Sequence, residues 1–257
     1  MLAASSLPTL CYAWIAVALV TYVLLQFVTA PFGRHTSTAW GPVLNNKVGW
    51  CLMELPSLLI MGGCAWREYY VDARPSSSYA WVLYTLWVAH YANRSIIYPL
   101  RIAATPKPMP VLIVLCACGF NLVNAGLNGA YLLHASAAYD ASWLVSPSTV
   151  LGLLLFLAGM AINCICDTML IRLRKPNETG YKIPRGFLFE RISCPNLLGE
   201  CIEWAGFGLM AWNPAATTFV LWTAANLVPR AASHHAWYQS HFKDYPRTRK
   251  AIVPFLY

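Results

Sequence analysis

The chain has 257 residues, of which 58% are hydrophobic and only 11% are charged. Soluble domains carry about 25% charged residues, so the composition excludes an ordinary water-soluble globule and indicates an integral membrane protein. A transmembrane helix needs about 20 apolar residues, which leaves room for about seven spans and little for a soluble domain. The formal charge of +8 would suggest a nucleic acid partner in a soluble protein. Here the basic residues cluster in loops between apolar runs, so no nucleic acid partner is expected.

Seven apolar segments follow one another, each bounded by Pro, Gly or charged residues. They predict an all-α, seven-transmembrane-helix bundle that forms a single membrane domain over residues 1–257. The expected spans are residues 10–30, 49–66, 79–100, 110–134, 146–171, 197–213 and 215–232. Only Asn213-Pro214 separates the last two, and an even number of spans would reverse the side of the C-terminus.

The Lys and Arg residues indicate the orientation, because cytosolic loops carry an excess of them. With seven spans, 15 of the 18 basic residues fall on one side, only Arg67 and Arg74 fall on the other, and Arg94 lies within the third span. This asymmetry predicts an external N-terminus and a cytosolic C-terminus.

Nine cysteines are scattered along the chain, and several lie inside apolar segments, where Cys behaves as a small hydrophobic residue. The pairs Cys116-x-Cys118 and Cys164-x-Cys166 lack the two-residue spacer of a zinc knuckle. We therefore expect free thiols and no metal site.

Ionisable and polar residues inside the spans are costly in lipid, so each of them suggests a functional site. Glu54 precedes Pro56, which frees a backbone carbonyl and bends the helix, and its carboxyl group could merely satisfy that bend. Four further segments carry polar residues at helical spacing, which places each set on one face. A single stripe could be an interhelical hydrogen-bond network, but four stripes near one side of the membrane favour a common site. The stripes are Tyr91, Arg94 and Tyr98; Asn163, Asp167 and Arg174; Asn196 and Glu200; and Arg230, His234 and Tyr238.

The most basic and least apolar stretch is RLRKPNETGYKIPRGFLFERISCPNLLGE at residues 172–200. It connects two of the polar stripes and suits an anionic ligand such as the phosphates of a nucleotide, although positive charge in a cytosolic loop could also reflect topology alone. No G-x-G-x-x-G after a strand and no G-x-x-x-x-G-K-[ST] occurs, so side chains on helices would have to hold a dinucleotide.

Several rare motifs occur in one order along most of the chain. They are MELPS (residues 53–57), HYxxRxxxYP (90–99), GMAINxxxD (159–167), LRKPNETGYKIPRGxLF (173–189), CPNLLGExxEW (194–204), PRAASHHAWY (229–238) and DYPRTRKAIVPF (244–255). On these motifs the chain resembles the steroid 5α-reductases, the 3-oxo-5α-steroid 4-dehydrogenases of the endoplasmic reticulum and their bacterial relatives, and we expect a bacterial homologue.

This resemblance implies a seven-helix bundle that encloses NADPH and reduces a steroid enone by hydride transfer to its β-carbon. Glu54 and Tyr91 would be the catalytic residues that hydrogen-bond the ketone. The region of about 110–257 would carry most of the cofactor contacts. The implied cofactor-binding residues are Arg94, Tyr98, Asn163, Asp167, Arg174, Tyr181, Asn196, Glu200, Arg230, His234 and Tyr238.

The resemblance also implies a hydrophobic, steroid-like substrate that enters from the bilayer, a cofactor site facing the cytosol and no obligate protein partner. The membrane would be the bacterial inner membrane, or the endoplasmic reticulum if the protein is eukaryotic. The chain departs from the family at Met53, Phe187 and Ser233, where Gln, Gly and His are common. Reduction of another lipid double bond, a membrane methyltransferase and a non-catalytic receptor or transporter remain as alternatives.

Overall fold

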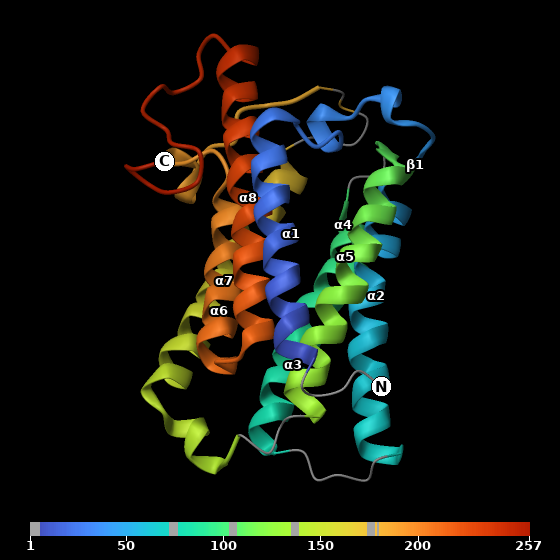
Figure 1. Ribbon diagram of the computed structural model, residues 1–257. Coiled ribbons are helices and arrows are strands. Elements are labelled where there is room, and N and C mark those ends of the chain that lie inside the picture. Colours follow the sequence, from blue (N-terminus) through green and yellow to red (C-terminus); the bar gives the residue numbers. More distant parts are fainter. Residues whose placement is uncertain (1–5, 72–76, 103–106, 135–138, 174–177, 179) are drawn as a thin grey trace.

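In a computed structural model, the described part of the chain is residues 6–71, 77–102, 107–134, 139–173, 178 and 180–257. These residues form an elongated bundle of helices that run alternately up and down (Figure 1). The chain enters at one end of the bundle and its C-terminus lies at the other. The helices are α1 (Leu7–Phe27), α2 (Asn46–Trp66), α3 (Ser78–Ala92), α4 (Tyr98–Arg101), α5 (Val111–Gly129), α6 (Pro147–Arg172), α7 (Pro195–Ala211) and α8 (Pro214–His241).

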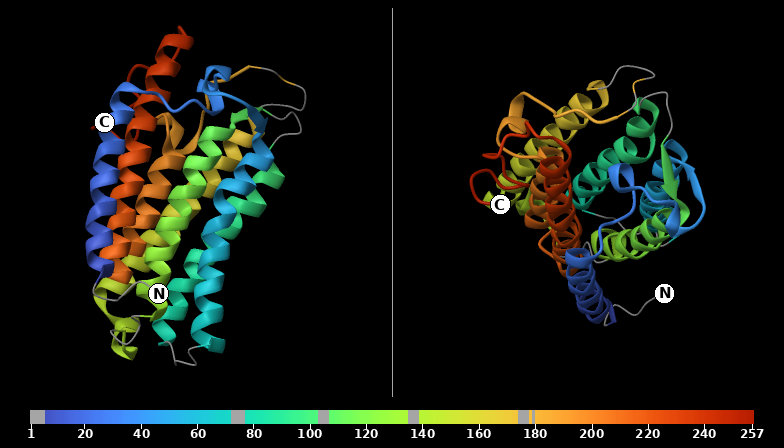
Figure 2. Two further views of the ribbon diagram at one scale, coloured as in Figure 1. Left: turned by 45° about the vertical axis from the view of Figure 1, so that its right-hand side comes forward. Right: turned by 90° about the horizontal axis from the view of Figure 1, so that it is seen from above.

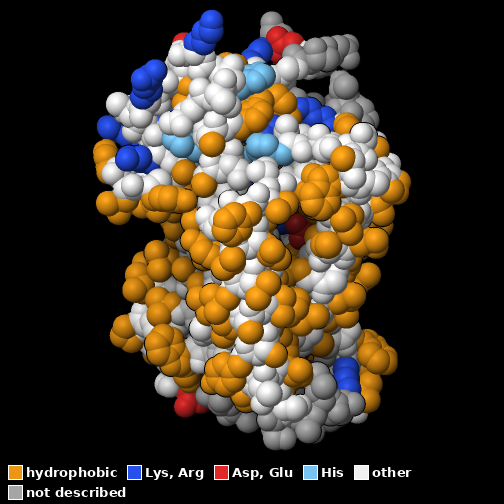
Figure 3. Space-filling model, turned by 45° about the horizontal axis from the view of Figure 1, so that its top comes forward, with side chains coloured by type: hydrophobic (Ala, Val, Ile, Leu, Met, Phe, Trp, Pro, Cys, Tyr) orange, Lys and Arg blue, Asp and Glu red, His pale blue; other side chains and the backbone are white. Residues whose placement is uncertain are grey.

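Seven helical rods result, because the π turn Asn93–Ile97 joins α3 to α4 in one continuous rod. Each rod corresponds to one of the seven expected segments. By length and composition, four described helices could span a membrane: Leu7–Phe27, Asn46–Val71, Val111–Leu132 and Pro147–Arg172. Hydrophobic side chains surround the bundle, whereas Lys and Arg gather mainly at the end that holds the C-terminus (Figure 3).

The segments that connect or follow the α-helices at this end form what we call the cap, namely residues 28–45, 107–110, 178, 180–194 and 242–257, with three short 3-10 turns. Within it, strands β1 (Val43–Asn45) and β2 (Pro108–Pro110) pair antiparallel, with Val43 opposite Pro110. The sequence predicted an all-α chain and did not indicate this pair of strands. Each strand has only three residues, too few to show the alternation of apolar and polar residues that marks a β-strand. The pairing fixes Asn46 beside Lys107, which exchange backbone and side-chain hydrogen bonds of 3.0 Å.

Helices α6 and α7 lie side by side along much of their length, as Figure 2 shows. Small residues make this approach possible. A Cβ atom added at Gly159 would lie 2.3 Å from the Glu203 backbone nitrogen, and one at Gly206 would lie 2.5 Å from the Gly152 carbonyl oxygen. The close contact brings the polar end of α6 against the polar start of α7.

Aromatic side chains fill the centre of the bundle. The Trp204 ring packs 4.2 Å from Phe219 and 5.3 Å from Trp87, measured between ring centroids. Beside them, the buried His90 Nδ1 lies 2.8 Å from Glu203 Oε1 and so links α3 to α7. All nine cysteines are free, as expected.

Candidate active site

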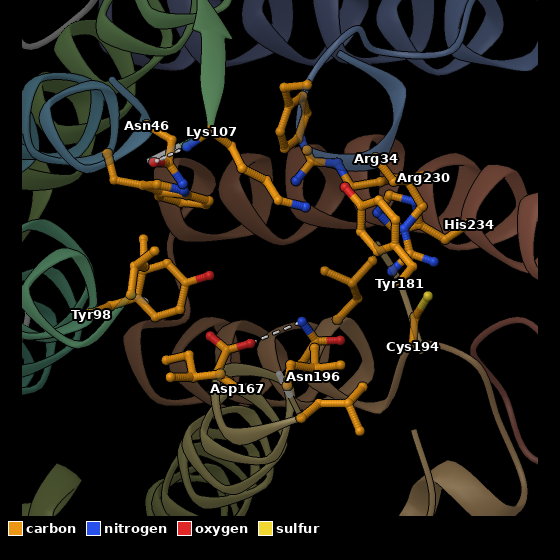
Figure 4. A pocket seen from close by; sticks show the side chains of 18 of the residues that line it. Arg34, Asn46, Tyr98, Lys107, Asp167, Tyr181, Cys194, Asn196, Arg230 and His234 are labelled. Carbon is orange, nitrogen blue, oxygen red and sulfur yellow. Dashed lines mark hydrogen bonds between the residues drawn. The ribbon is translucent and has the colours of Figure 1, made fainter. Parts of the chain in front are cut away.

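A cavity of about 250 Å³ opens at the cap end of the bundle. Figure 4 shows Tyr98, Asp167 and Asn196 at one end of it, and Arg34, Arg230 and His234 at the other. Its walls come from α2, the α3–α4 rod, α6, α7, α8 and the cap. The sequence predicted that most cofactor contacts lie in about 110–257, but residues before position 110 also line the cavity.

At the deep end, Arg94 and a set of carboxamide and carboxylate groups form a buried network. Arg94 Nη1 lies 3.4 Å from Asp167 Oδ2, and Asn196 Nδ2 donates to Asp167 Oδ1 at 3.0 Å. Asn163 Nδ2 donates in turn to the Asn196 carbonyl oxygen at 3.0 Å. Because α6 and α7 approach so closely, the two Asn residues and Asp167 meet across their interface. This network holds polar groups in fixed positions at the cavity wall.

Arg94 is also enclosed by aromatic rings. Its guanidinium lies 4.5 Å from the Trp50 ring centre and 5.2 Å from that of Tyr98, and the two rings meet edge to face. Such cation–π contacts hold a guanidinium in place. Glu200 of α7 lines the same part of the cavity and acts on Arg94 electrostatically.

The other end of the cavity is rich in cations. Arg34 Nη2 donates to the Tyr238 hydroxyl at 3.1 Å, and its guanidinium lies over the rings of Tyr238 and Trp237. Arg230 lies over the Phe32 ring. The buried Arg34 Nη1 and Arg230 Nε atoms have no hydrogen-bond partner among the residues that the structure describes. Buried N–H groups of this kind usually have a partner, so this end suits an anionic ligand.

Two histidines close the cation-rich end. His35 Nε2 and His234 Nδ1 lie 3.1 Å apart, and the rings stack in parallel. Partial burial lowers the pKa of His35, and the neighbouring Arg34 guanidinium lowers it further. Both effects favour the neutral form of the His35 imidazole.

Glu54 lies just beyond Arg94 and does not line the cavity. Its Oε1 atom is 4.0 Å from Arg94 Nη2, and Asn121 Nδ2 donates to its Oε2 atom at 3.3 Å. The same Asn121 amide donates to the Met53 carbonyl oxygen at 2.6 Å, and Cys118 Sγ donates to the Leu52 carbonyl oxygen, which Pro56 leaves without its helical partner. Side chains of α5 thus supply hydrogen bonds to the backbone carbonyl groups at the bend of α2, beside Glu54.

Tyr91 is buried with 3% of its surface exposed. Its ring packs against Trp87 at 5.1 Å and against His90 at 5.0 Å, and it does not line the cavity. The π turn at Asn93–Ile97 explains this position, since it adds a residue to the turn and shifts Tyr91 from the face of Tyr98. The constant helical spacing assumed for Tyr91, Arg94 and Tyr98 does not hold here.

The cavity unites most of the residues singled out in the sequence. Nine line it: Arg94, Tyr98, Asp167, Tyr181, Asn196, Glu200, Arg230, His234 and Tyr238. Asn163 supports it from behind, Glu54 and Tyr91 lie outside its lining, and Arg174 falls outside the described residues.

Several lining residues were not predicted from the sequence, among them Arg34, Asn46 and Lys107. Arg34 and Lys107 counted only as topological charges, and Asn46 stands near the start of an apolar span without a polar stripe. The folding of the cap brings Arg34 and Lys107 to the cavity, and no local spacing encodes that.

Comparison with known proteins gives consistent similarities over nearly the whole chain. The family profile of the 3-oxo-5-alpha-steroid 4-dehydrogenases matches residues 107–257. The 3-oxo-5-alpha-steroid 4-dehydrogenase 1 of Bos taurus is 40% identical over 254 residues, which cover 97% of this chain and 96% of that protein. The steroid 5-alpha-reductase DET2 of Gossypium hirsutum is 39% identical over 94% of this chain and 93% of its own length. The Homo sapiens 3-oxo-5-alpha-steroid 4-dehydrogenase 1 is 36% identical, over 98% and 95%. These relatives are eukaryotic and give no support to a bacterial origin.

Proposed function

Because this chain belongs to the 3-oxo-5-alpha-steroid 4-dehydrogenase family of steroid 5-alpha-reductases, we propose that it is a membrane-embedded enzyme that uses NADPH to reduce the Δ4 double bond of a 3-oxo-steroid. One observation carries this proposal. Arg94 lies between the cavity and Glu54, within 3.4 Å of Asp167 on one side and 4.0 Å of Glu54 on the other. A cofactor in the cavity would therefore lie next to the carboxyl group that we propose binds the ketone.

The cavity residues fit NADPH. Arg34 and Arg230 present buried N–H groups that no other described residue satisfies. Lys107 adds a third cation at the wall, which suits the phosphates of a dinucleotide. The amide and carboxyl groups of Asn196, Asp167 and Glu200 can bind a carboxamide at the deep end. Arg174 and Tyr181 complete the proposed set. When bound, NADPH supplies the hydride.

Glu54 and Tyr91 have the chemistry to polarise the substrate. Conjugate reduction builds negative charge on the ketone oxygen, and preorganised donors in a water-poor site stabilise that charge strongly. The Tyr91 hydroxyl donates the proton to this oxygen, and Glu54 makes the second hydrogen bond. Both belong to the bundle interior, and the Tyr91 hydroxyl lies within the electrostatic reach of Glu54 and Arg94.

The membrane setting follows from the apolar exterior. We propose seven crossings, with the cap and its cavity facing the cytosol, where NADPH is found, and a steroid that enters the bundle from the lipid. Consistent with this arrangement, the basic side chains lie mainly at the cap end of the molecule. The endoplasmic reticulum is the expected membrane in a eukaryotic source.

The decisive experiment is product analysis. Purified protein in lipid nanodiscs is incubated with NADPH and a 3-oxo-Δ4-steroid, and the product is identified by mass spectrometry and its stereochemistry by NMR. The proposal requires a 5α-reduced 3-oxo-steroid. Parallel reactions with a polyprenol, an enoyl thioester and S-adenosylmethionine test the alternatives, and turnover with any of these instead of the steroid would replace the proposal.

A further inference from the structure

Five large apolar side chains are exposed on two segments of the cap, residues 180–194 and 242–257. They are Phe187, Val253, Phe255, Leu256 and Tyr257, of which Phe255 and Leu256 are the most open, at 73% and 79% of their surface. We call this group the apolar ledge. In Figure 3, hydrophobic side chains gather directly below Lys and Arg on the side where Figure 1 places the C-terminal segment.

Exposed basic residues lie in the same two segments: Lys182, Arg185, Arg191, Lys243, Arg247 and Lys250. The Arg191 guanidinium lies 5.4 Å from the centre of the Phe255 ring. Three acidic residues lie in these parts of the cap, Glu178, Glu190 and Asp244. Glu178 pairs with Lys182, and Glu190 is shared between Arg185 at 3.8 Å and Arg249 at 3.4 Å. These parts of the cap therefore keep a net positive charge.

Backbone pairing fixes the depth of the ledge along the bundle. The backbone nitrogens of Ser193 and Cys194 donate to the carbonyl oxygens of Lys250 and Ala251 at 2.8 and 3.1 Å. Because α7 begins at Pro195, residues 251–257 lie at the level of its first turn. This is where the apolar band of the bundle gives way to the cap.

The backbone directs the ledge outward at a conformational cost. Phe187 and Phe255 adopt φ angles of 47° and 68°, a left-handed region that bulky residues rarely enter. The Tyr257 carbonyl oxygen accepts hydrogen bonds from the backbone nitrogens of Ile252 and Val253, so the chain end folds back and leaves Phe255 and Leu256 exposed. In water, exposure of these apolar side chains would not offset the cost of the strained φ angles.

We propose that the apolar ledge inserts into the boundary between lipid headgroups and acyl chains at the cap end, where the basic residues of the same two segments bind anionic phospholipids. Aromatic rings at this depth beside Lys and Arg are typical of membrane-interface anchors, and anionic headgroups attract clustered basic residues. Ser193 and Cys194, which pair with the ledge segment, also line the cavity. The inserted ledge would therefore connect the cavity wall to the bilayer through the backbone pairing of Ser193 and Cys194.

Photo-crosslinking tests the insertion directly. The full chain carrying Phe255→p-benzoylphenylalanine is placed in nanodiscs that contain phosphatidylcholine and phosphatidylglycerol, irradiated and analysed by mass spectrometry. The matched control places the same side chain at Ser240, an exposed position on α8. The ledge segment pairs with Cys194, and Cys194 contacts the Ala231 carbonyl oxygen of α8. Ala231 therefore marks the level of the ledge on α8, and Ser240 lies nine residues, or about 13 Å, beyond it along the helix.

Lipid adducts at position 255 and none at position 240 are expected. Absence of lipid adducts at 255, equal adducts at both positions, or protein–protein adducts at 255 would overturn the proposal. A second pair of substitutions, Arg247→Glu with Lys250→Glu, tests the role of charge while Phe255 and its turn remain. The phosphatidylglycerol share of the adducts should fall about fivefold or more, and an unchanged share would overturn the anionic-lipid assignment. Each variant is first shown to be folded by its thermal unfolding and its elution in size-exclusion chromatography.

Discussion

The two carboxylate oxygens of Glu54 have different neighbours. Oε1 faces Arg94 at 4.0 Å, too far for a direct hydrogen bond, whereas Oε2 accepts from Asn121 Nδ2 at 3.3 Å. Oε2 is therefore held as an acceptor, and Oε1 is the oxygen left to bind the substrate. In the proposed mechanism, a protonated carboxyl group would keep its proton on Oε1 and donate a hydrogen bond to the ketone oxygen, while Tyr91 supplies the transferred proton.

The first prediction concerns Tyr91 and Glu54. Tyr91→Phe removes only the hydroxyl and keeps the ring that packs on Trp87, so turnover should fall by about 10² or more while NADPH affinity hardly changes. Glu54→Gln keeps a donor and should retain partial activity if the native carboxyl group is protonated. Single-turnover kinetics at saturating NADPH measures both. Parental turnover in Tyr91→Phe would contradict the mechanism.

The second prediction concerns Asn121, which no sequence motif revealed. Asn121→Ala removes the donor to Glu54 Oε2 and to the Met53 carbonyl oxygen, so turnover should fall by up to about tenfold, since a hydrogen bond contributes about 0.5–1.5 kcal/mol. The steroid KM should change less than kcat. Asn128→Ala is the matched control, because Asn128 is also buried on α5 but donates to Asn124 instead of to α2. A similar kcat loss in both variants would point to general destabilisation.

The third prediction concerns the cation-rich end of the cavity. Arg34→Leu should weaken NADPH binding by tenfold or more, because it removes both a charge and the group that stacks on Tyr238 and Trp237. Arg34→Lys keeps the charge and loses the planar stack, so its loss should be intermediate. Calorimetric titration of NADPH and NADH measures the effect. Parental NADPH affinity in Arg34→Leu would exclude this residue from the phosphate site.

At the scale of elements, most helix positions follow from the sequence because apolar runs and Pro, Gly and charged breaks coincide with the helices. α8 is the main exception. It continues nine residues past the expected end at residue 232, since its polar stripe keeps helical spacing outside the apolar run. The π turn at Asn93–Ile97 was also missed, because apolar and polar patterns do not distinguish a π turn from an α turn.

The fourth prediction concerns the contact between α6 and α7. Gly159→Ala would place a Cβ atom 2.3 Å from the backbone nitrogen of Glu203, so the helices must separate and stability should fall by about 1–3 kcal/mol. Gly62→Ala is the control, since nothing lies within 4 Å of its added Cβ atom. Thermal unfolding in detergent measures both. Because Asn163 and Asn196 meet across this contact, Gly159→Ala should also weaken NADPH binding.

At the scale of the whole molecule, the sequence predicts that polar stripes converge but not how the cavity is closed. Helical spacing shows that Asp167 and Arg230 each belong to a polar face, and the bundle brings these faces together. Arg34 and Lys107 reach the same cavity through the β1–β2 pairing and the turns of the cap. Such contacts depend on tertiary folding of segments with no periodic pattern, which is why the sequence did not indicate them.

The last prediction concerns orientation in the membrane. The two ends of the bundle differ in charge, with Lys and Arg concentrated beside the C-terminus and the N-terminal helix starting at the opposite end. Since cytosolic loops retain basic residues, a reporter fused to the C-terminus should be cytosolic and one fused to the N-terminus external. Membrane-impermeant labelling of intact cells or sealed vesicles measures both. Labelling of both termini from one side would contradict seven crossings, and full reversal would place the cavity on the side that lacks NADPH.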